Sequence, residues 1–372
     1  MNRVIVSIIS EQTIPNYLFI KEFYQLGDSL LFIASQKFSM RIDWIVKTLG
    51  FVDVGIESIF FPEGVEERWK DMESRLRDSL SDDKFYIVNL TGGTKYMSLL
   101  VQRVFESFNS VFYYIPYPQN IILEPSKNDS IPLSYRLTIE EYLSNYNVSF
   151  SYKNIVQDET YCDYFFDRFV NGSLGSWGYE ILDLLRSYRN KKKVAVASLE
   201  SAIHTEKRPK IERLNEFLSS IHFPIREKGF LNRSEIEYLT GGWFEEYMYY
   251  KIKRYIVPQD IKLGVLIKRT ENTNQNDLDV VFVSGNKLFV IECKTGILGK
   301  GMFNETVYKA TAIKEAVLGL SATTFICSLA MEEKELKNTA KNMGISYICR
   351  EDIQDFSRMD AFMNQIKIKA KD

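Results

Sequence analysis

The chain has 372 residues, of which 45% are hydrophobic, so it is long enough for two or three domains with packed cores. Its formal net charge is only −2, which excludes a globally basic protein and means that nucleic-acid binding needs a local positive surface. With only two histidines, His204 and His222, histidine-based phosphodiesterase chemistry and a histidine-rich metal centre are disfavoured. Carboxylates must therefore hold any metal ion.

No apolar run approaches the roughly 18 residues that a membrane-spanning helix needs, and the N-terminal strand lacks a signal-peptide cleavage pattern. We therefore expect a cytoplasmic protein. The four cysteines are widely scattered, without the paired spacing of a zinc site or of a disulfide framework. We interpret Cys162, Cys293, Cys327 and Cys349 as buried thiols.

The first part of the chain predicts a parallel α/β sheet. Residues 3–9 form a continuous apolar strand that ends in Ser10, Glu11 and Gln12 before an amphipathic helix, and a second buried strand at 30–34 also precedes a helical stretch. Buried strands that alternate with helices are typical of parallel sheets, whose ligand-binding loops lie at the carboxyl ends of the strands. Ser10 to Gln12 alone also fit an ordinary turn.

A glycine turn follows the next buried strand, at 85–90, and leads into a helix at 96–108. Glycines let the backbone approach a ligand, and the N-terminus of the helix offers free N–H groups to a phosphate. The spacing is neither that of the nucleoside-triphosphate loop nor that of the dinucleotide fingerprint, which disfavours a triphosphate-driven motor. The candidate ligand-binding residues of this turn are Asn89, Thr91, Gly92, Gly93, Thr94 and Lys95.

The middle of the chain reads as a helical connector that begins after the glycine- and serine-rich stretch at 171–176. Apolar positions at helical spacing predict helices at 179–188, 194–203 and 211–221. Between Arg186 and Arg213 there are nine Lys or Arg residues against three Glu. This basic stretch is either a patch that follows a nucleic-acid backbone beside a catalytic site or a solvated loop.

A predicted β-hairpin in the last third of the chain contains the candidate metal-binding residues. Two apolar runs at 280–283 and 288–291 are joined by a short glycine-containing turn, which predicts two antiparallel strands. Asp279 lies where the first strand begins, and Glu292 and Lys294 leave one face of the second because side chains alternate. The hairpin can therefore bring two carboxylates and one ammonium together. Such carboxylates suit Mg²⁺ or Mn²⁺, which retains water for phosphodiester hydrolysis, and the lysine can orient that water.

These residues resemble the PD-(D/E)xK nuclease motif, with Asp279 as the first acid, Glu292 as the second and Lys294 as the lysine. Members of that family take another acid from an upstream helix. Here an aromatic-rich helix offers Glu245, and Glu246 is a rival for the role. Without that helix, a plain hairpin with solvated polar ends would be the better interpretation.

The resemblance implies a restriction-endonuclease-like α/β domain with metal-dependent catalysis by Glu245, Asp279, Glu292 and Lys294. It departs from the family pattern at one position, because Leu278 stands where a proline or small residue is usual. Lys309, on an expected helix at 304–318, is a candidate to face the scissile phosphate. The metal ligands that we assign for Mn²⁺ or Mg²⁺ are Glu245, Asp279, Glu292 and Cys293.

The N-terminal motifs resemble the CARF domain, the Rossmann-like sensor of cyclic oligoadenylate in CRISPR-associated proteins. The likeness covers about the first 150 residues and rests mainly on Thr91 to Lys95, and secondarily on Ser10 to Gln12. A CARF domain joined to a PD-(D/E)xK domain is similar to the stand-alone ancillary nucleases of type III CRISPR systems. The resemblance implies a homodimer that binds cyclic tetra-adenylate and then cleaves DNA, RNA or both.

We therefore expect three parts: a sensor at 1–150, a helical connector at 151–233 and a nuclease domain at 234–372. The alternative is a nucleotide-sensing, nucleic-acid-binding regulator whose nuclease-like domain is inactive. The retained acids and lysine favour the enzyme, because a degenerate domain is expected to have lost at least one of them.

Overall fold

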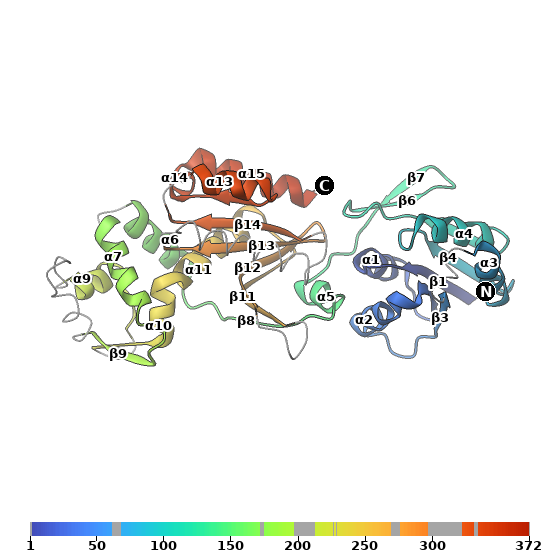
Figure 1. Ribbon diagram of the computed structural model, residues 1–372, viewed down its shortest axis with the longest axis horizontal. Helices are drawn as coiled ribbons and strands as arrows, with labels where there is room; N and C mark the ends of the chain where they lie inside the picture. Colours follow the sequence, from blue (N-terminus) through green and yellow to red (C-terminus); the bar gives the residue numbers. More distant parts are fainter. Residues whose placement is uncertain are drawn as a thin grey trace.

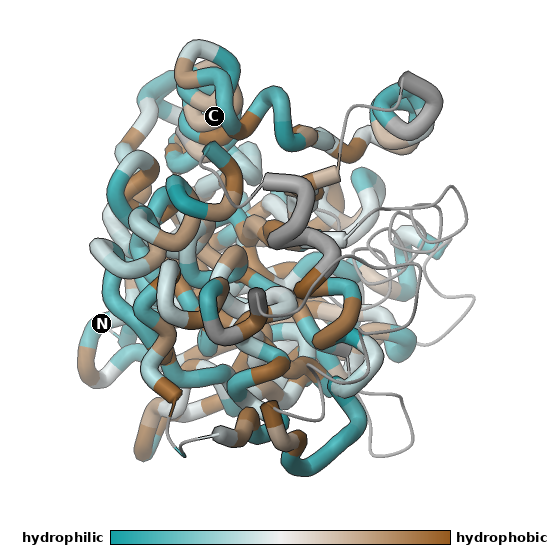
Figure 2. The backbone as a smooth tube through the Cα atoms, turned by 90° about the vertical axis from the view of Figure 1, so that its left-hand side faces the viewer, coloured by the Kyte–Doolittle hydropathy of each residue, from teal (hydrophilic) through white to brown (hydrophobic). Residues whose placement is uncertain are grey.

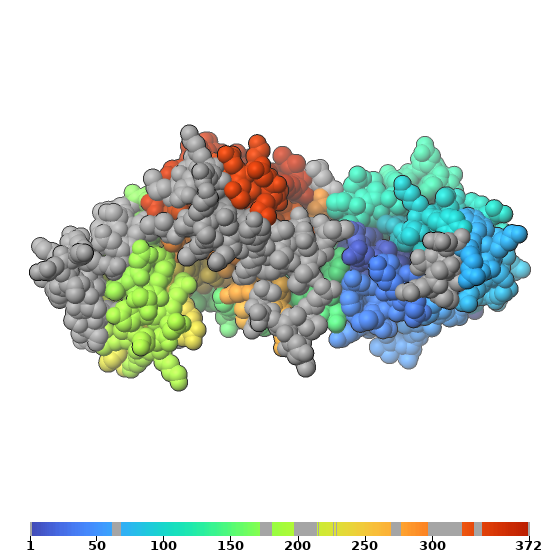
Figure 3. Space-filling view, viewed as in Figure 1, coloured from blue at the N-terminus to red at the C-terminus, as the bar shows by residue number. Residues whose placement is uncertain are grey.

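The computed structural model describes residues 2–61, 68–171, 175–196, 213–225, 227, 229–268, 276–296, 322–330 and 334–371. Three parts follow one another along the long axis of the molecule (Figure 1), with an N-terminal sheet at one end, a second sheet in the middle and a small helical part at the other end. The space-filling view shows the same order, with the blue and cyan N-terminal part opposite the yellow-green middle of the chain (Figure 3). Hydrophilic segments follow much of the periphery when the molecule is viewed end-on (Figure 2).

The N-terminal domain is a five-stranded parallel sheet with the strand order β3-β2-β1-β4-β5, which confirms the predicted Rossmann-like α/β class. Its strands are β1 (Asn2–Ile9), β2 (Ser29–Ser35), β3 (Ile56–Phe61), β4 (Lys84–Asn89) and β5 (Ser110–Tyr113). The helices are α1 (Ile14–Phe23), η1 (Gln36–Phe38), α2 (Ser39–Leu49), α3 (Trp69–Asp78) and α4 (Lys95–Phe105). Strand order reverses between β1 and β4, the place where open α/β sheets bind ligands.

Alternation along β1 shows how the two faces of this sheet are covered. Val4, Val6 and Ile8 pack in one hydrophobic cluster with α3 and α4. Ile5 and Ile9 pack in another cluster, together with α1 and α2. Because both faces are buried, the strand reads as a continuous apolar run, which is why the sequence predicts it well.

A short segment links this domain to the second sheet. It contains the hairpin β6 (Ile121–Glu124) and β7 (Asp129–Pro132), then α5 (Ile139–Ser144) and β8 (Ser149–Tyr152). β8 joins the second sheet, so this sheet begins at the residue where we expected the first domain to end. Tyr142 and Leu143 of α5 share a hydrophobic cluster with Val281 and Leu288 of the second sheet and with α1. The two domains therefore share one continuous core through α5.

The second sheet is mixed and has the strand order β15-β14-β13-β12-β11-β8. Its other strands are β11 (Asp260–Lys268), β12 (Asn276–Ser284), β13 (Lys287–Lys294), β14 (Thr323–Ser328) and β15 (Ser346–Ile348). Neighbouring strands among β8, β11, β12 and β13 pair antiparallel, and β13, β14 and β15 pair parallel. Helices α13 (Lys334–Asn342), α14 (Arg350–Gln354) and α15 (Phe356–Lys371) lie along one side of it (Figure 1).

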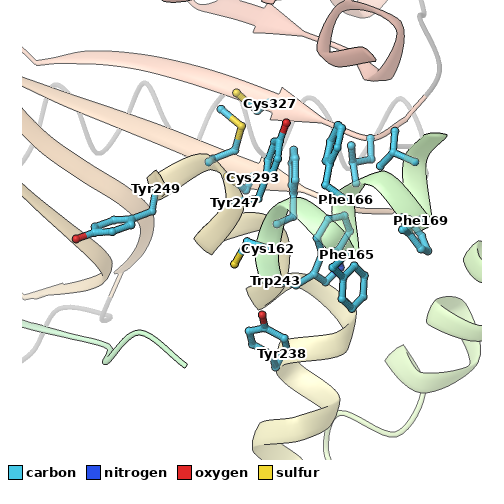
Figure 4. Packing of buried hydrophobic residues seen from close by; sticks show 14 of the residues in the cluster. Cys162, Phe165, Phe166, Phe169, Tyr238, Trp243, Tyr247, Tyr249, Cys293 and Cys327 are labelled. Atoms are coloured by element: carbon cyan, nitrogen blue, oxygen red, sulfur yellow. The ribbon is translucent and has the colours of Figure 1, made fainter. Parts of the chain in front are cut away.

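An aromatic core joins this sheet to the helical part, in the same hydrophobic cluster that α14 and α15 enter. Trp243 on α11 (Trp243–Tyr255) stacks on Phe165 of α6 (Glu159–Phe166), with ring centroids 4.4 Å apart. Phe166 stacks on Tyr247 at 4.1 Å in the same cluster (Figure 4). The large rings bury much apolar surface and fix the position of α11 over the sheet. The side chains of α11 thus have a rigid support.

The helical part contains η2 (Asp167–Asn171), α7 (Gly175–Arg186), α9 (Arg213–Ser220), α10 (Arg233–Glu237) and η3 (Tyr238–Gly242). The predicted helix at 194–203 is wrong at its start, because β9 (Lys193–Ala195) pairs antiparallel with β10 (Phe230–Asn232). A short apolar run cannot be assigned to helix or strand by periodicity alone. Residues 197–212, which include the remainder of that predicted helix, His204 and part of the basic stretch, lie outside the described residues.

The four cysteines are buried and free, as predicted. Across the described ranges, no helix is both long and apolar enough to cross a membrane.

Candidate functional site

The predicted hairpin is formed by β12 and β13, whose pairing reaches as far as Val280 and Ile291 next to the predicted acids. β12 already begins at Asn276, so Asp279 lies within the strand and not at its start, where we expected it. Beyond the last pair, the backbone N–H of Cys293 donates to Oδ2 of Asp279 at 2.6 Å. The carboxylate of Asp279 therefore turns toward β13.

Gly264 on β11 marks a break in the sheet beside Asp279. Residues two apart on a regular strand share a face, yet Leu263 and Val265 belong to different hydrophobic clusters. Their partners on β12 are divided in the same way, and the pairing skips Gly264 and Asp279. Gly264 has a φ of +56°, which glycine adopts without strain. Because the strand changes direction here, the Asp279 side chain does not follow the alternation that places its neighbours in the two hydrophobic clusters.

Lys294 joins the two hairpin acids. Its Nζ lies 3.1 Å from Oε2 of Glu292 and 3.4 Å from Oδ2 of Asp279. Burial opposes the charge of Lys294, but the two carboxylates raise its pKa above the usual value for lysine. The ammonium is therefore charged at neutral pH and is held at the point where the predicted residues meet.

Glu245 approaches the same place from α11. This helix follows η3, a π-helical turn, and such wide turns often occur at functional sites. Burial, and after it the charge of Asp279, raises the pKa of Glu245 to about 8. The raised pKa thus reflects first the loss of solvent around the carboxyl group and second the charge of Asp279.

Glu246, the rival helix acid, has structural partners. It is 1% exposed, and its carboxylate accepts hydrogen bonds from the backbone N–H groups of Val156 and Gln157, the latter at 3.2 Å. The Cys162 thiol also lies 3.7 Å from its Oε2. Burial raises the pKa of Glu246. Glu246 thus holds the segment after β8 against α11, whereas Glu245 faces the hairpin acids.

Lys153 is a site residue that the sequence analysis missed. Its Nζ lies 3.0 Å from Oδ2 of Asp277 and 3.9 Å from Oε2 of Glu245. Gly264 makes room for it, because a Cβ at that position would lie 2.4 Å from Cδ of Lys153. No local motif identifies this lysine, since β8 is far from the hairpin in sequence and only the sheet register places it there.

These side chains line a cleft of about 810 Å³. The cleft also receives Arg186 from the end of α7 and Arg189 from the turn after it. Nη2 of Arg186 donates to Oγ1 of Thr295 at 2.9 Å, and Nε of Arg189 donates to Oγ1 of Thr240 at 2.7 Å. Both arginines belong to the basic stretch seen in the sequence, but their approach to the acids was not predicted.

The acids have the chemistry of a site for a hard cation. Glu245, Asp279 and Glu292 offer carboxylate oxygens, which Mg²⁺ and Mn²⁺ prefer, and Asp279 is close enough to Glu245 to add to the rise in its pKa that burial causes. Within the described ranges, no three His, Cys, Asp or Glu side chains are gathered closely enough to hold a metal ion. Cys293, which we assigned as a metal ligand, packs in the hydrophobic core.

A second cavity, of about 510 Å³, lies at the carboxyl ends of β1, β2 and β4. Most of the predicted turn lines it, as do Ser10, Glu11 and Gln12. Lys95 is exposed at the first residue of α4 and does not line the cavity. The lining residues that we did not predict include Lys37, Tyr114 and Tyr117.

The glycine turn is held in place by side chains beneath it. Asn89 does not line the cavity, but its Nδ2 donates to Oδ1 of the buried Asn16 at 3.0 Å. Its own Oδ1 accepts from the backbone N–H of Thr91 at 3.0 Å. A Cβ on Gly92 would lie 1.7 Å from the carbonyl oxygen of Ile8, so only glycine fits this position. The turn thus packs directly on β1.

The sequence contained a signal for Lys37 as a cavity residue, because Lys37 follows β2 at the same edge of the sheet.

Comparison with known proteins agrees with this architecture. Residues 4–142 match the family described as the Card1 CARF domain, and residues 232–364 match the family described as the Card1-like endonuclease domain. No curated protein matches the chain.

Lys309, the lysine that we expected to face the scissile phosphate, and its expected helix lie outside the described residues.

Several solved structures share the fold. Protein VC1899 from Vibrio cholerae is 19% identical, with a TM-score of 0.82 over 100% of this chain and 99% of that one. Can2 from Sulfobacillus thermosulfidooxidans, in complex with cyclic tetra-adenylate, is 21% identical, with a TM-score of 0.72 and full coverage of both chains. A type III CRISPR defence DNA nuclease activated by cyclic oligoadenylate is 15% identical, with a TM-score of 0.52 over 88% of this chain and 45% of that one.

Proposed function

Because the chain joins a Card1 CARF domain to a Card1-like endonuclease domain, we propose that it is an endonuclease of type III CRISPR defence that cyclic oligoadenylate activates. The observation that carries the proposal is the meeting of Lys294 with Asp279 and Glu292 in a cleft that also contains Glu245. Its substrate is a nucleic-acid phosphodiester, in DNA or RNA.

Catalysis depends on a divalent metal, Mn²⁺ or Mg²⁺, held by Glu245, Asp279 and Glu292. When bound, the metal lowers the pKa of a water nucleophile and neutralises charge on the phosphate. Lys294 is kept charged by the hairpin acids and stabilises the negative charge that develops as the water attacks. Lys153, on the other side of Glu245, balances the remaining carboxylates.

The N-terminal cavity is the site for the activator, which we propose is cyclic tetra-adenylate. The turn from Thr91 to Thr94 offers backbone N–H groups at the start of α4, which suits phosphate. Lys37 lines the cavity and Lys95 lies beside it, so both supply positive charge. A ring of four nucleotides is larger than the ligands that one cavity of this size encloses, so two copies of the chain share it as a homodimer.

A chain of hydrogen bonds supports activation of the nuclease by the sensor. Oγ1 of Thr91 accepts from the backbone N–H of Ile115 at 2.7 Å. Tyr117, which lines the same cavity, donates its hydroxyl to the carbonyl of Asn286 at 3.1 Å. Asn286 lies in the turn between β12 and β13, the hairpin that carries Asp279. A ligand that moves the turn at Thr91 therefore acts on the catalytic hairpin.

The decisive experiment is cleavage of supercoiled plasmid, single-stranded DNA and single-stranded RNA with Mn²⁺ or Mg²⁺, each with and without cyclic tetra-adenylate. We expect cutting only when both metal and ligand are present. Glu292→Ala and Lys294→Ala abolish cutting and keep ligand binding. If the ligand binds and no substrate is cut under any condition, the protein is a nucleotide-sensing regulator instead.

The sensor assignment is tested by calorimetric titration with cyclic tetra-adenylate. Loss of a charge-assisted phosphate contact costs about 1.5–3 kcal/mol of binding free energy. We expect Lys95→Ala and Lys37→Ala each to weaken binding by this amount. Unchanged affinity in both variants would show that the phosphates lie elsewhere.

A further inference from the structure

Arg189 differs from the other cations of the catalytic cleft in what surrounds it. Lys294 contacts two carboxylates and Lys153 lies 3.0 Å from that of Asp277, while Arg186 forms an ion pair with Asp183. Among the residues that the structure describes, no carboxylate lies within 4.0 Å of the Arg189 guanidinium. The carboxylates of Glu245, Glu237 and Asp279 act on Arg189 only from a longer distance. An arginine in a cleft that forms no direct ion pair points to an anionic ligand.

The guanidinium of Arg189 is held in a defined position. Nε donates to Oγ1 of Thr240 at 2.7 Å, and the same hydroxyl donates to the carbonyl of Ile236 at 2.6 Å. This contact uses one of the five N–H donors and leaves the two terminal nitrogens for a ligand. The guanidinium is therefore fixed by a neutral partner, and among the described residues its terminal nitrogens form no direct ion pair.

Nη2 of Arg189 and Oε1 of Glu245 both lie close to the backbone of Gly241. A Cβ on Gly241 would lie 3.0 Å from Nη2 of Arg189 and 3.8 Å from Oε1 of Glu245. The guanidinium thus lies against the bare backbone of Gly241, in the turn that leads into α11. Gly296, just after the catalytic hairpin, has the same relation to Arg186, because a Cβ there would lie 3.3 Å from Cζ of that arginine.

We propose that Arg189 binds a phosphate of the nucleic-acid strand beside the carboxylates, so that the helical connector completes the substrate site of the nuclease. The proposal rests on the nuclease function proposed above. Guanidinium forks match phosphate oxygens in pairs of hydrogen bonds. Arg186 already has Asp183 and Thr295 as partners and contributes less to substrate binding.

The test is binding of labelled single-stranded DNA, single-stranded RNA and duplex DNA, measured by fluorescence anisotropy over a range of salt concentrations. The full chain is used with cyclic tetra-adenylate in a Glu292→Gln background, which removes cutting. Adding Arg189→Ala is expected to raise Kd at least about tenfold. The slope of log K against log salt should fall by about 0.7–0.9, the value for one phosphate contact.

Matched variants separate this role from a structural one. Arg254→Ala removes an arginine of α11 that pairs with Glu159 outside the cleft, and it should leave Kd and slope unchanged. Arg189→Gln keeps a polar side chain near Thr240 without the charge and should behave like Arg189→Ala. Arg189→Lys should keep the slope and recover part of the affinity, because it retains a charge without the fork.

The outcomes distinguish this proposal from the nuclease function. If Arg189→Ala and Arg189→Gln bind with unchanged Kd and slope while the parent protein binds, Arg189 contacts no phosphate and the nuclease function still stands. A parent protein that binds neither DNA nor RNA, with the activator present, overturns both proposals.

Discussion

Asn286 connects the two domains, and its replacement by alanine should separate their behaviour. The residue is 1% exposed in the turn of the catalytic hairpin. Its Nδ2 donates to Oδ1 of Asn120 at 2.8 Å and to the carbonyl of Tyr135 at 3.0 Å. Its Oδ1 accepts from the backbone N–H of Leu137 at 2.9 Å and from Nε2 of Gln259 at 3.2 Å. One side chain thus ties the hairpin to the segment that leaves the sensor.

The expected cost follows from these contacts. Each net hydrogen bond contributes about 0.5–1.5 kcal/mol, and buried groups that lose their partner cost more. Asn286 also has a φ of +60°, where alanine adds about 1 kcal/mol or more of backbone strain. Because the four side-chain bonds share one site and are not additive, we expect Asn286→Ala to cost about 3–5 kcal/mol.

Urea unfolding and activation assays measure the two consequences. The wild-type chain should unfold with the sensor and the nuclease coupled through their common core. In Asn286→Ala the sensor should unfold in a separate transition that cyclic tetra-adenylate moves to higher urea. The variant should bind the ligand with little change but lose most of the ligand-dependent increase in cleavage.

Asn128→Ala provides the control. Asn128 has a φ of +52° in the exposed turn between β6 and β7, so the substitution adds similar backbone strain without removing a buried contact. If Asn286→Ala unfolds like Asn128→Ala and is activated like the wild type, the hydrogen bonds of Asn286 do not couple the domains and the reasoning fails.

Three further predictions concern other parts of the molecule. Gly264→Ala should lower Tm by a stability loss of about 1–3 kcal/mol, because its Cβ would overlap Lys153 at a φ of +56°; an unchanged Tm contradicts it. Gly92→Ala should abolish ligand binding in a titration, because its Cβ would lie 1.7 Å from the carbonyl oxygen of Ile8; normal binding would show that β1 yields. Burial opposes the charge of Glu141, but hydrogen bonds from two tyrosines and a threonine N–H lower its pKa. Its stabilisation is present above the ordinary glutamate pKa of about 4.3 and is lost as pH falls through the lowered value. Tm should therefore fall more steeply below about pH 4 in the wild type than in Glu141→Gln, and parallel curves would refute this.

Local patterns in the sequence determined the class of both domains. Buried parallel strands such as β1 are apolar on both faces, so they stand out as continuous runs whatever surrounds them. The hairpin acids and Lys294 are close in sequence, and strand alternation alone relates Glu292 to Lys294. The glycine turn at 91–95 could also be recognised, because it follows its strand directly in the sequence. Periodicity failed at 194–195, where a short apolar run fits either a helix or a strand.

Only the tertiary structure decided which distant residues meet at these sites. Glu245 and Glu246 are neighbours in the sequence, but packing of α11 directs one to the hairpin acids and the other to the backbone after β8. Lys153 and Arg189 reach the cleft because sheet register and helix packing bring remote segments together. Such contacts depend on long-range geometry, and no local sequence pattern encodes them. The candidate acids and Lys294 could thus be named from the sequence, whereas the positions of Lys153 and Arg189 beside them were set by the fold.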